Sequence, residues 1–290
     1  MRVRFWGTRG SVPSPGRETA RFGGNTPCIS VDVGSGTPLI FDAGTGIRAL
    51  GLDLAASPDE PLELFLSHTH WDHIQGLPFF APLYQRDRPL RIWGADDPPG
   101  TLERTMQTLM APAVFPVPFE SAGARVEFRS LPFDSVSLGG VTVRAIPVHH
   151  PGGAAGFRLE SGQAAMVYVP DNELRGTDGV PANVRRSLRE ACRGAAVLIH
   201  DSTYTSEESA NVLGWGHSTA DEAVALALET EVQTLILFHH APQRTDDDVD
   251  RLVEHCRSTV RNAGSHLRVI AAAEGETFVV GKRAPGIVQR

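Results

Sequence analysis

Three histidines and one aspartate fall within six consecutive positions of this chain, directly after the apolar run Leu64-Phe65-Leu66. The stretch reads Ser67-His68-Thr69-His70-Trp71-Asp72-His73. In an extended segment, residues two apart face the same way, so His68 and His70 can hold one cation. If a helix begins next, Asp72 and His73 point elsewhere and can serve a second cation. One metal needs three or four protein ligands and two metals need about six, so the motif predicts further ligands downstream.

The composition is that of a globular protein and excludes several other classes. The chain has 290 residues, of which 41% are hydrophobic, enough for a sizeable core. No stretch approaches the ~18 consecutive apolar residues of a membrane span, and the N-terminus lacks the apolar run of a secretory signal. The three cysteines are far apart and have no CxxC spacing, which favours reduced thiols over disulfides or thiolate metal sites. These features predict a cytoplasmic protein with no membrane partner.

The charge balance favours a small substrate over a long nucleic acid. The formal net charge is −7 and the isoelectric point is near 5.9. Proteins that grip long nucleic acids usually carry a basic face, and none is obvious here. A local basic patch within an acidic total would still accommodate RNA.

Short strands alternate with turns along both halves of the chain. The pattern predicts strands at 2–6, 29–33, 39–41, 62–66, 90–93, 125–129, 141–146, 155–159, 166–169, 197–200, 235–238 and 269–271. It predicts helices at 73–84 and 101–110, and two more that begin at the capping boxes Ser218/Asp221 and Thr245/Asp248. We expect one domain, 1–290, with two pseudo-repeated halves at roughly 1–150 and 151–290. Its fold class is α/β, a four-layer αββα sandwich with two sheets face to face and helices outside.

Other polar residues follow predicted strands further along the chain. They are His150, Asp171, His200, His239 and His240. Imidazoles and carboxylates at strand ends converge on one edge of a sheet, where sites usually form. Asp171 is suited to bridge two cations through its two oxygens.

The run His68-Thr69-His70-Trp71-Asp72-His73 resembles the HxHxDH hallmark of the metallo-β-lactamase superfamily. By position, the resemblance implies two ligand sets that share Asp171 as a bridge. The first set is His68, His70 and His150, and the second is Asp72, His73 and His239. His150 is preferred to His149 because the family has a His-before-Pro-Gly-Gly pattern, and His239 is preferred to His240 for its spacing from the strand. The implied cofactors are two divalent ions, with zinc expected and manganese or iron also compatible with these donors.

A narrower resemblance comes from two downstream motifs, Ile199-His200-Asp201-Ser202-Thr203-Tyr204 and Gly216-His217-Ser218-Thr219-Ala220. They are similar to the phosphodiesterase branch, which includes tRNA 3′-processing endonucleases, cyclic-nucleotide phosphodiesterases and PhnP-like enzymes. In that branch, a histidine of an HST motif sits beside the metals and is oriented by a carboxylate, here His217 and Asp201. The family more often has Glu at the position of Asp201, so the reach is one methylene shorter. Segments 5–11 and 41–46 also match, so the resemblance covers essentially the whole chain.

The resemblance implies a dinuclear metal-dependent phosphodiesterase. A hydroxide bridging the metals would attack phosphorus, and Asp72 would hold one metal and orient that hydroxide. His217 would be the general acid for the leaving alkoxide, with Asp201 fixing its tautomer. The tRNA-processing members carry a long Gly-rich, basic arm, and nothing similar interrupts this sequence. The expected substrate is therefore a small phosphodiester such as a cyclic nucleotide.

Other interpretations stay open. The protein could be an RNA-processing nuclease of the same branch, a lactonase- or thioesterase-type hydrolase without need of the Asp201–His217 pair, or a non-catalytic metal-binding module. His217 could instead belong to a helix start, and Asp42 could bond a ligand histidine or simply form a turn. His200 is expected to be a buried, hydrogen-bonded histidine. The apolar, proline-rich segment 111–119 suits a homodimer contact, a pocket lid or core packing.

Overall fold

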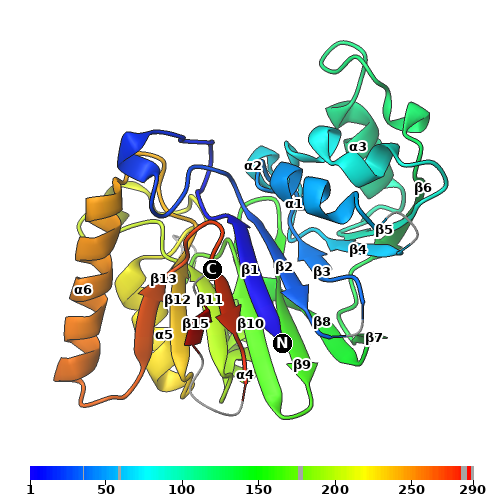
Figure 1. Cartoon of the computed structure of the whole chain (residues 1–290). Helices are drawn as coiled ribbons and strands as arrows, with labels where there is room; N and C mark the ends of the chain where they lie inside the picture. Colours follow the sequence, from blue (N-terminus) through cyan, green and yellow to red (C-terminus); the bar gives the residue numbers. More distant parts are fainter. Residues whose placement is uncertain (35, 58–59, 176–178, 282–285, 289–290) are drawn as a thin grey trace.

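The computed structural model describes residues 1–34, 36–57, 60–175, 179–281 and 286–288. Within these residues, two mixed sheets lie face to face (Figure 1). The first sheet has the order β15 (Gly286–Val288), β14 (Thr277–Val279), β1 (Arg2–Gly7), β2 (Cys28–Asp32), β3 (Leu39–Phe41), β4 (Leu62–Phe65), β5 (Pro89–Gly94), β6 (Arg125–Ser130). The second has the order β13 (Arg268–Ala271), β12 (Thr234–Phe238), β11 (Val197–Asp201), β10 (Ala164–Val169), β9 (Ala154–Ser161), β8 (Val141–Val148), β7 (Val136–Leu138).

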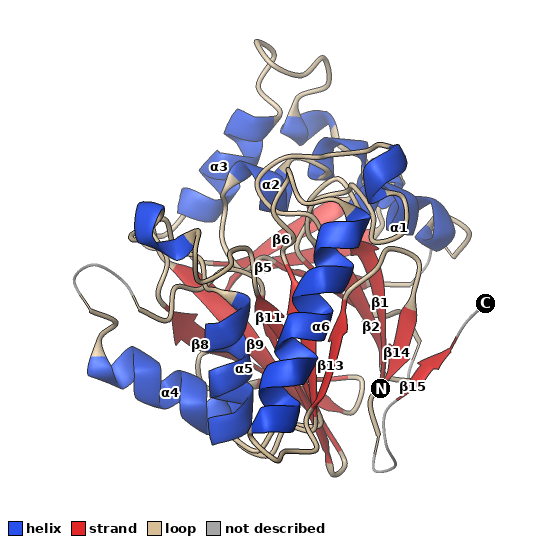
Figure 2. Cartoon of the chain, turned by 90° about the vertical axis from the view of Figure 1, so that its left-hand side faces the viewer, coloured by secondary structure: helices blue, strands red, loops and turns tan. Residues whose placement is uncertain are grey.

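Helices cover the outer face of each sheet. The second sheet carries α4 (Ala182–Cys192), α5 (Ala220–Glu229) and α6 (Asp246–Asn262), which lie in front of its strands in Figure 2. The first sheet carries α1 (Ile47–Leu54), α2 (Trp71–Ile74) and α3 (Thr101–Leu109). Short 3₁₀ turns are η1 (Arg17–Thr19), η2 (Leu77–Phe79), η3 (Ala81–Tyr84), η4 (Phe119–Ser121) and η5 (Ser209–Asn211). The expected four-layer αββα sandwich is confirmed.

Side-chain alternation along the central strands sorts the core into layers. In β12, Ile236 and Phe238 belong to the apolar layer between the sheets, whereas Leu235 and Leu237 pack under the helices. Strands buried on both faces read as continuous apolar runs, which is why the run 235–238 shows no polar alternation. Between the sheets the rings of Phe41 and Phe65 stack with centroids 5.1 Å apart.

The sheets do not divide the chain at residue 150. β7 and β8 belong to the second sheet although they precede that position, and β14 and β15 return to the edge of the first sheet beside β1. The polypeptide therefore crosses from the first sheet to the second and back again.

One helix prediction was wrong. The segment 73–84 is not one helix, because α2 ends at Ile74 and the separate turns η2 and η3 follow. Pro78 and Pro82 lack the N–H that a continuous helix needs, and each is the second residue of a short 3₁₀ turn instead.

The capping boxes were predicted with mixed success. The box at the start of α5 is formed by Thr219 and Glu222, one residue beyond the predicted pair, because the Ser218 hydroxyl donates to the carbonyl of Asn172. The box of Thr245 and Asp248 at α6 is confirmed. Among the described helices, none combines the length and apolar composition that a bilayer-spanning helix requires.

Candidate metal centre

The two sheets contribute their strand ends to one cluster of imidazoles and carboxylates. Four of its members follow β4 in the first sheet: His68, His70, Asp72 and His73. The others follow β8, β10 and β12 in the second sheet: His150, Asp171 and His239. The structure thus brings together all seven residues that the sequence and the resemblance singled out as ligands.

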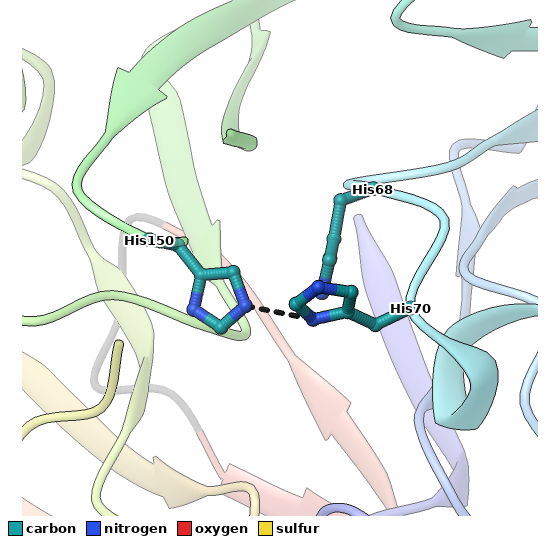
Figure 3. Close-up of side chains that lie close together, drawn as sticks. All are labelled: His68, His70 and His150. Carbon is teal, nitrogen blue, oxygen red and sulfur yellow. Dashed lines mark hydrogen bonds between the residues drawn. The ribbon is translucent and has the colours of Figure 1, made fainter. Parts of the chain in front are cut away.

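The first ligand group is built around three histidines that face one another (Figure 3). Nε2 of His150 lies 2.9 Å from Nδ1 of His70. Nε2 of His68 lies 3.7 Å from Oδ2 of Asp171, and Nε2 of His150 lies 3.8 Å from the same oxygen. One ligand atom from each of the three histidines lies within 4.8 Å of the other two, a separation that one cation can span.

The second ligand group lies on the other side of Asp171. Nε2 of His73 is 3.0 Å from Oδ1 of Asp171 and 3.4 Å from Oδ2 of Asp72. Nε2 of His239 is 3.4 Å from that Asp171 oxygen and 3.3 Å from that Asp72 oxygen. Because the two oxygens of Asp171 face different groups, this carboxylate has the geometry of a bridge.

The nitrogens on the far side of the rings have partners of their own. Nδ1 of His73 lies 3.1 Å from Oδ2 of Asp42, a carboxylate that also accepts hydrogen bonds from the Tyr168 hydroxyl and the Ser67 N–H. Asp42 has a φ of 61°, so it is a turn residue and a partner of a candidate ligand at once. Such partners orient a ligating imidazole and set its tautomer.

His150 and His239 are held in the same way. Nδ1 of His150 lies 2.9 Å from the carbonyl oxygen of Gly216, and Nδ1 of His239 lies 3.0 Å from Oγ1 of Thr203. The neighbouring His240 turns away from the cluster and places Nε2 2.9 Å from the carbonyl oxygen of Ala272. The geometry therefore favours His239 over His240.

The imidazole and carboxylate groups of the cluster suit divalent cations, and several of their ligand atoms have no hydrogen-bond partner. Within the part of the chain that the structure describes, Nε2 of His68, Nε2 of His73 and Oδ1 of Asp171 are buried without a hydrogen bond. Burial, followed by the charge of His73, holds the pKa of His68 well below its ordinary value, which keeps a lone pair for a metal. Burial raises the pKa of Asp171, but the surrounding imidazoles outweigh it and hold that pKa well below the usual range. Buried carboxylates need a compensating positive charge, and bound cations would supply it.

His217 and Asp201 form a separate pair beside the cluster. Nδ1 of His217 lies 2.9 Å from Oδ2 of Asp201 and 3.9 Å from Oδ2 of Asp171. Its ring stacks on that of His239, with centroids 4.8 Å apart. Burial lowers the pKa of His217, but the nearby carboxylates, Asp201 first, outweigh burial and raise the pKa to about 9. Because Thr219 caps α5, the His217 ring is not needed for the helix start.

Residues 37–240 match a family model described as a beta-lactamase superfamily domain. The chain belongs to this superfamily. It is 27% identical over 304 residues to ribonuclease Z of Methanosarcina acetivorans, a match that covers 90% of this chain and 94% of the relative. The metallo-β-lactamase fold protein YhfI from Bacillus subtilis superposes with a TM-score of 0.70 at 20% identity, covering 97% and 98% of the two chains. The short form of human tRNase Z gives 0.66 at 19% identity, covering 97% and 100%. Superfamily membership together with the His/Asp cluster identifies a metal-dependent hydrolase.

One buried carboxylate that shapes this superfamily site was not found from the sequence. Glu173 accepts hydrogen bonds from the N–H groups of Gly214 and Gly216, at 2.8 and 2.9 Å. It thereby fixes the loop that presents the Gly216 carbonyl to His150 and leads into His217. In the sequence, Glu173 is marked only by its place two residues after Asp171, and this position does not distinguish a buried structural glutamate from one exposed to solvent.

The expectation for His200 was correct. The side chain is fully buried, and Nδ1 lies 2.6 Å from the carbonyl oxygen of Asp201. It therefore supports the strand end that carries Asp201 and lies outside the ligand groups.

Proposed function

We propose that the protein is a dinuclear metal-dependent phosphodiesterase acting on a small phosphodiester, with cyclic nucleotides as the expected class. The observation that carries this proposal is the Asp201–His217 pair beside the two ligand groups. An alkoxide leaving phosphorus needs a proton, and an oriented histidine can supply it. Hydrolysis of a thioester does not require such an acid, because a thiolate leaves without being protonated first.

Two groups of side chains would hold the cations. The first is His68, His70 and His150 and the second is Asp72, His73 and His239, with Asp171 shared between them. When bound, two divalent cations supply Lewis acidity and a hydroxide nucleophile at neutral pH. Imidazole and carboxylate donors suit zinc, and manganese and iron accept the same set.

His217 is the candidate general acid. Asp201 occupies Nδ1, so Nε2 is the nitrogen left to donate a proton to the leaving group. A pKa of about 9 keeps the ring protonated at neutral pH. Cations in the cluster would lower this pKa, because they repel the imidazolium, and would bring it closer to the value at which an acid works best.

An RNA-processing nuclease is the second candidate function. It is supported by the relatives called ribonuclease Z, which the chain matches over most of their length. The net charge of −7 and the lack of a long Gly-rich, basic arm in the sequence favour the smaller substrate.

Metal content and turnover, measured on one preparation, test this proposal. We expect two divalent ions per chain by mass spectrometry, with hydrolysis of bis-p-nitrophenyl phosphate and of at least one 3′,5′- or 2′,3′-cyclic nucleotide. Cleavage of a 3′-extended tRNA precursor without turnover of any cyclic nucleotide would favour the nuclease. Hydrolysis of a lactone or thioester with no phosphodiesterase activity would contradict both and leave His217 without its role.

A further inference from the structure

A groove lies beside the open side of the candidate metal centre. Of the seven candidate ligands, His70 is exposed, while the other six are buried. Its chain neighbours Thr69 and Trp71 both line the groove, which has a volume of about 550 Å³ and whose opposite wall is α3. The groove therefore adjoins the chain segment that carries His70, although His70 itself is not part of its lining.

Trp71 presents its indole to the groove. The side chain is 66% exposed, although the next two residues in the same helical turn, Asp72 and His73, are buried in the cluster. Tryptophan is usually largely buried, so an exposed indole next to the candidate metal centre is available for contact with a ligand. Its flat face suits another flat ring.

The wall opposite Trp71 carries a cation. Arg104 on α3 donates to Oγ1 of Thr101 at 3.0 Å and forms no ion pair with any residue in the described part of the chain. The groove lining contains threonines and apolar side chains but no carboxylate, in a chain whose net charge is −7. Arg104 thus keeps donors for a ligand, and no acid in the lining opposes an anionic one.

We propose that this groove binds the nucleobase of the substrate, stacked on Trp71, with Arg104 donating to acceptor atoms on the edge of the base. The inference rests on the proposed phosphodiesterase function, because the scissile phosphate would sit at the adjoining cluster. A guanidinium pairs best with O6 and N7 of guanine, so guanine is expected to bind better than adenine. The groove volume lies within the range of small-molecule pockets.

The test is competitive inhibition of bis-p-nitrophenyl phosphate hydrolysis by GMP and by ribose 5-phosphate, which lacks the base. In the metal-loaded wild-type protein, GMP should inhibit more strongly than ribose 5-phosphate by about 5- to 150-fold, the range given by base–aromatic stacking. Trp71→Leu should bring the two inhibition constants together, whereas Trp71→Phe should preserve most of the difference. Phe79→Leu is the matched control, because Phe79 is 59% exposed on the same side of the first sheet and does not line the groove.

Arg104→Gln, a substitution at an exposed position, is a second test of the groove proposal. It should reduce the preference for GMP over AMP, measured as the ratio of the two inhibition constants at equal metal content. Equal inhibition by GMP and ribose 5-phosphate in the wild-type protein, or an unchanged ratio in Trp71→Leu at equal metal content, overturns the groove proposal while the phosphodiesterase stands.

If the wild-type protein hydrolyses no phosphodiester, the proposed function is wrong, and the groove proposal is then tested by measuring GMP binding alone. Quenching of indole fluorescence by GMP that disappears in Trp71→Leu would then support the groove. Lack of quenching in the wild-type protein would overturn it as well.

Discussion

Nδ1 of His217 and Oδ2 of Asp201 lie 2.9 Å apart, and the carboxylate is fully buried. Asp201 is itself held by hydrogen bonds from Thr203 and from the N–H of Asn172. The imidazole therefore has one fixed orientation. The shorter reach of aspartate, compared with the glutamate more usual in the family, is sufficient here.

Asp201→Asn should lower kcat by about 10²- to 10⁴-fold, because the ring loses the partner that sets its tautomer and charge. The carboxylate raises the pKa of His217, so its loss should move the alkaline limb of the pH–rate profile to lower pH. Metal content should stay at the wild-type level. Asp201→Glu keeps the negative charge and should retain more activity, and an unshifted alkaline limb in Asp201→Asn would contradict the assignment.

Gly216→Ala should weaken metal binding at the first ligand group. Gly216 has a φ of 88°, and an added Cβ would lie 2.2 Å from Nδ1 of His150, so the imidazole would have to move. Gly140→Ala is the control, because Gly140 has a φ of 84° with nothing within 4 Å of the added Cβ. Both variants carry similar backbone strain. A loss of bound metal in Gly216→Ala alone, measured by titration with a competing chelator, would isolate the contact with His150.

Asp42→Asn should reduce metal affinity by about 10- to 100-fold without removing any ligand, as loss of such outer partners does. The substitution removes the charge beside Nδ1 of His73, and because an amide has a single acceptor oxygen, it can keep the hydrogen bond from the Ser67 N–H while losing the one that the Tyr168 hydroxyl donates to Oδ2. The measurement is a metal titration with the unfolding temperature as a check on folding. An unchanged affinity would show that Asp42 serves only the turn.

Thr245→Ala should destabilise the protein by about 1 kcal/mol, since it removes the hydroxyl that caps α6. Thr259→Ala, within the same helix, should cost little, because alanine favours a helix. The hydrogen bonds from Thr245 lower the pKa of Asp248, so the stabilisation is present near neutral pH and is lost as the pH falls. Urea unfolding at neutral and acidic pH should show the deficit of Thr245→Ala shrinking in acid, and activity should not change.

Local patterns in the sequence were enough to locate most of the cluster. His68, His150, Asp171 and His239 each follow an apolar strand, and in the structure these strand ends of the two facing sheets meet at one site. The Thr245 capping box was equally local. The helix predicted at 73–84 is wrong because Pro78 and Pro82 lack the N–H groups of a continuous helix, so the segment divides into α2 and two short turns.

Contacts between distant parts of the chain could not be predicted in this way. Glu173 bonds to a loop more than forty positions away, and Asp42 meets Tyr168 across the space between the sheets. Neither contact leaves a periodic signal. The return of β14 to the first sheet was missed for a similar reason, because three residues are too few to show a strand pattern.

The pairing of β14 with β1 has a consequence for how the protein is made. Arg2 lies opposite Val279 and Arg4 opposite Thr277, so this edge of the N-terminal strand is covered by residues near the other end of the sequence. During translation, β1 and β2 can pair early, but the outer edge of β1 stays bare until residues 277–279 have left the ribosome. An uncovered edge invites pairing with other chains. The nascent protein is thus exposed to such pairing until β14 has docked on β1.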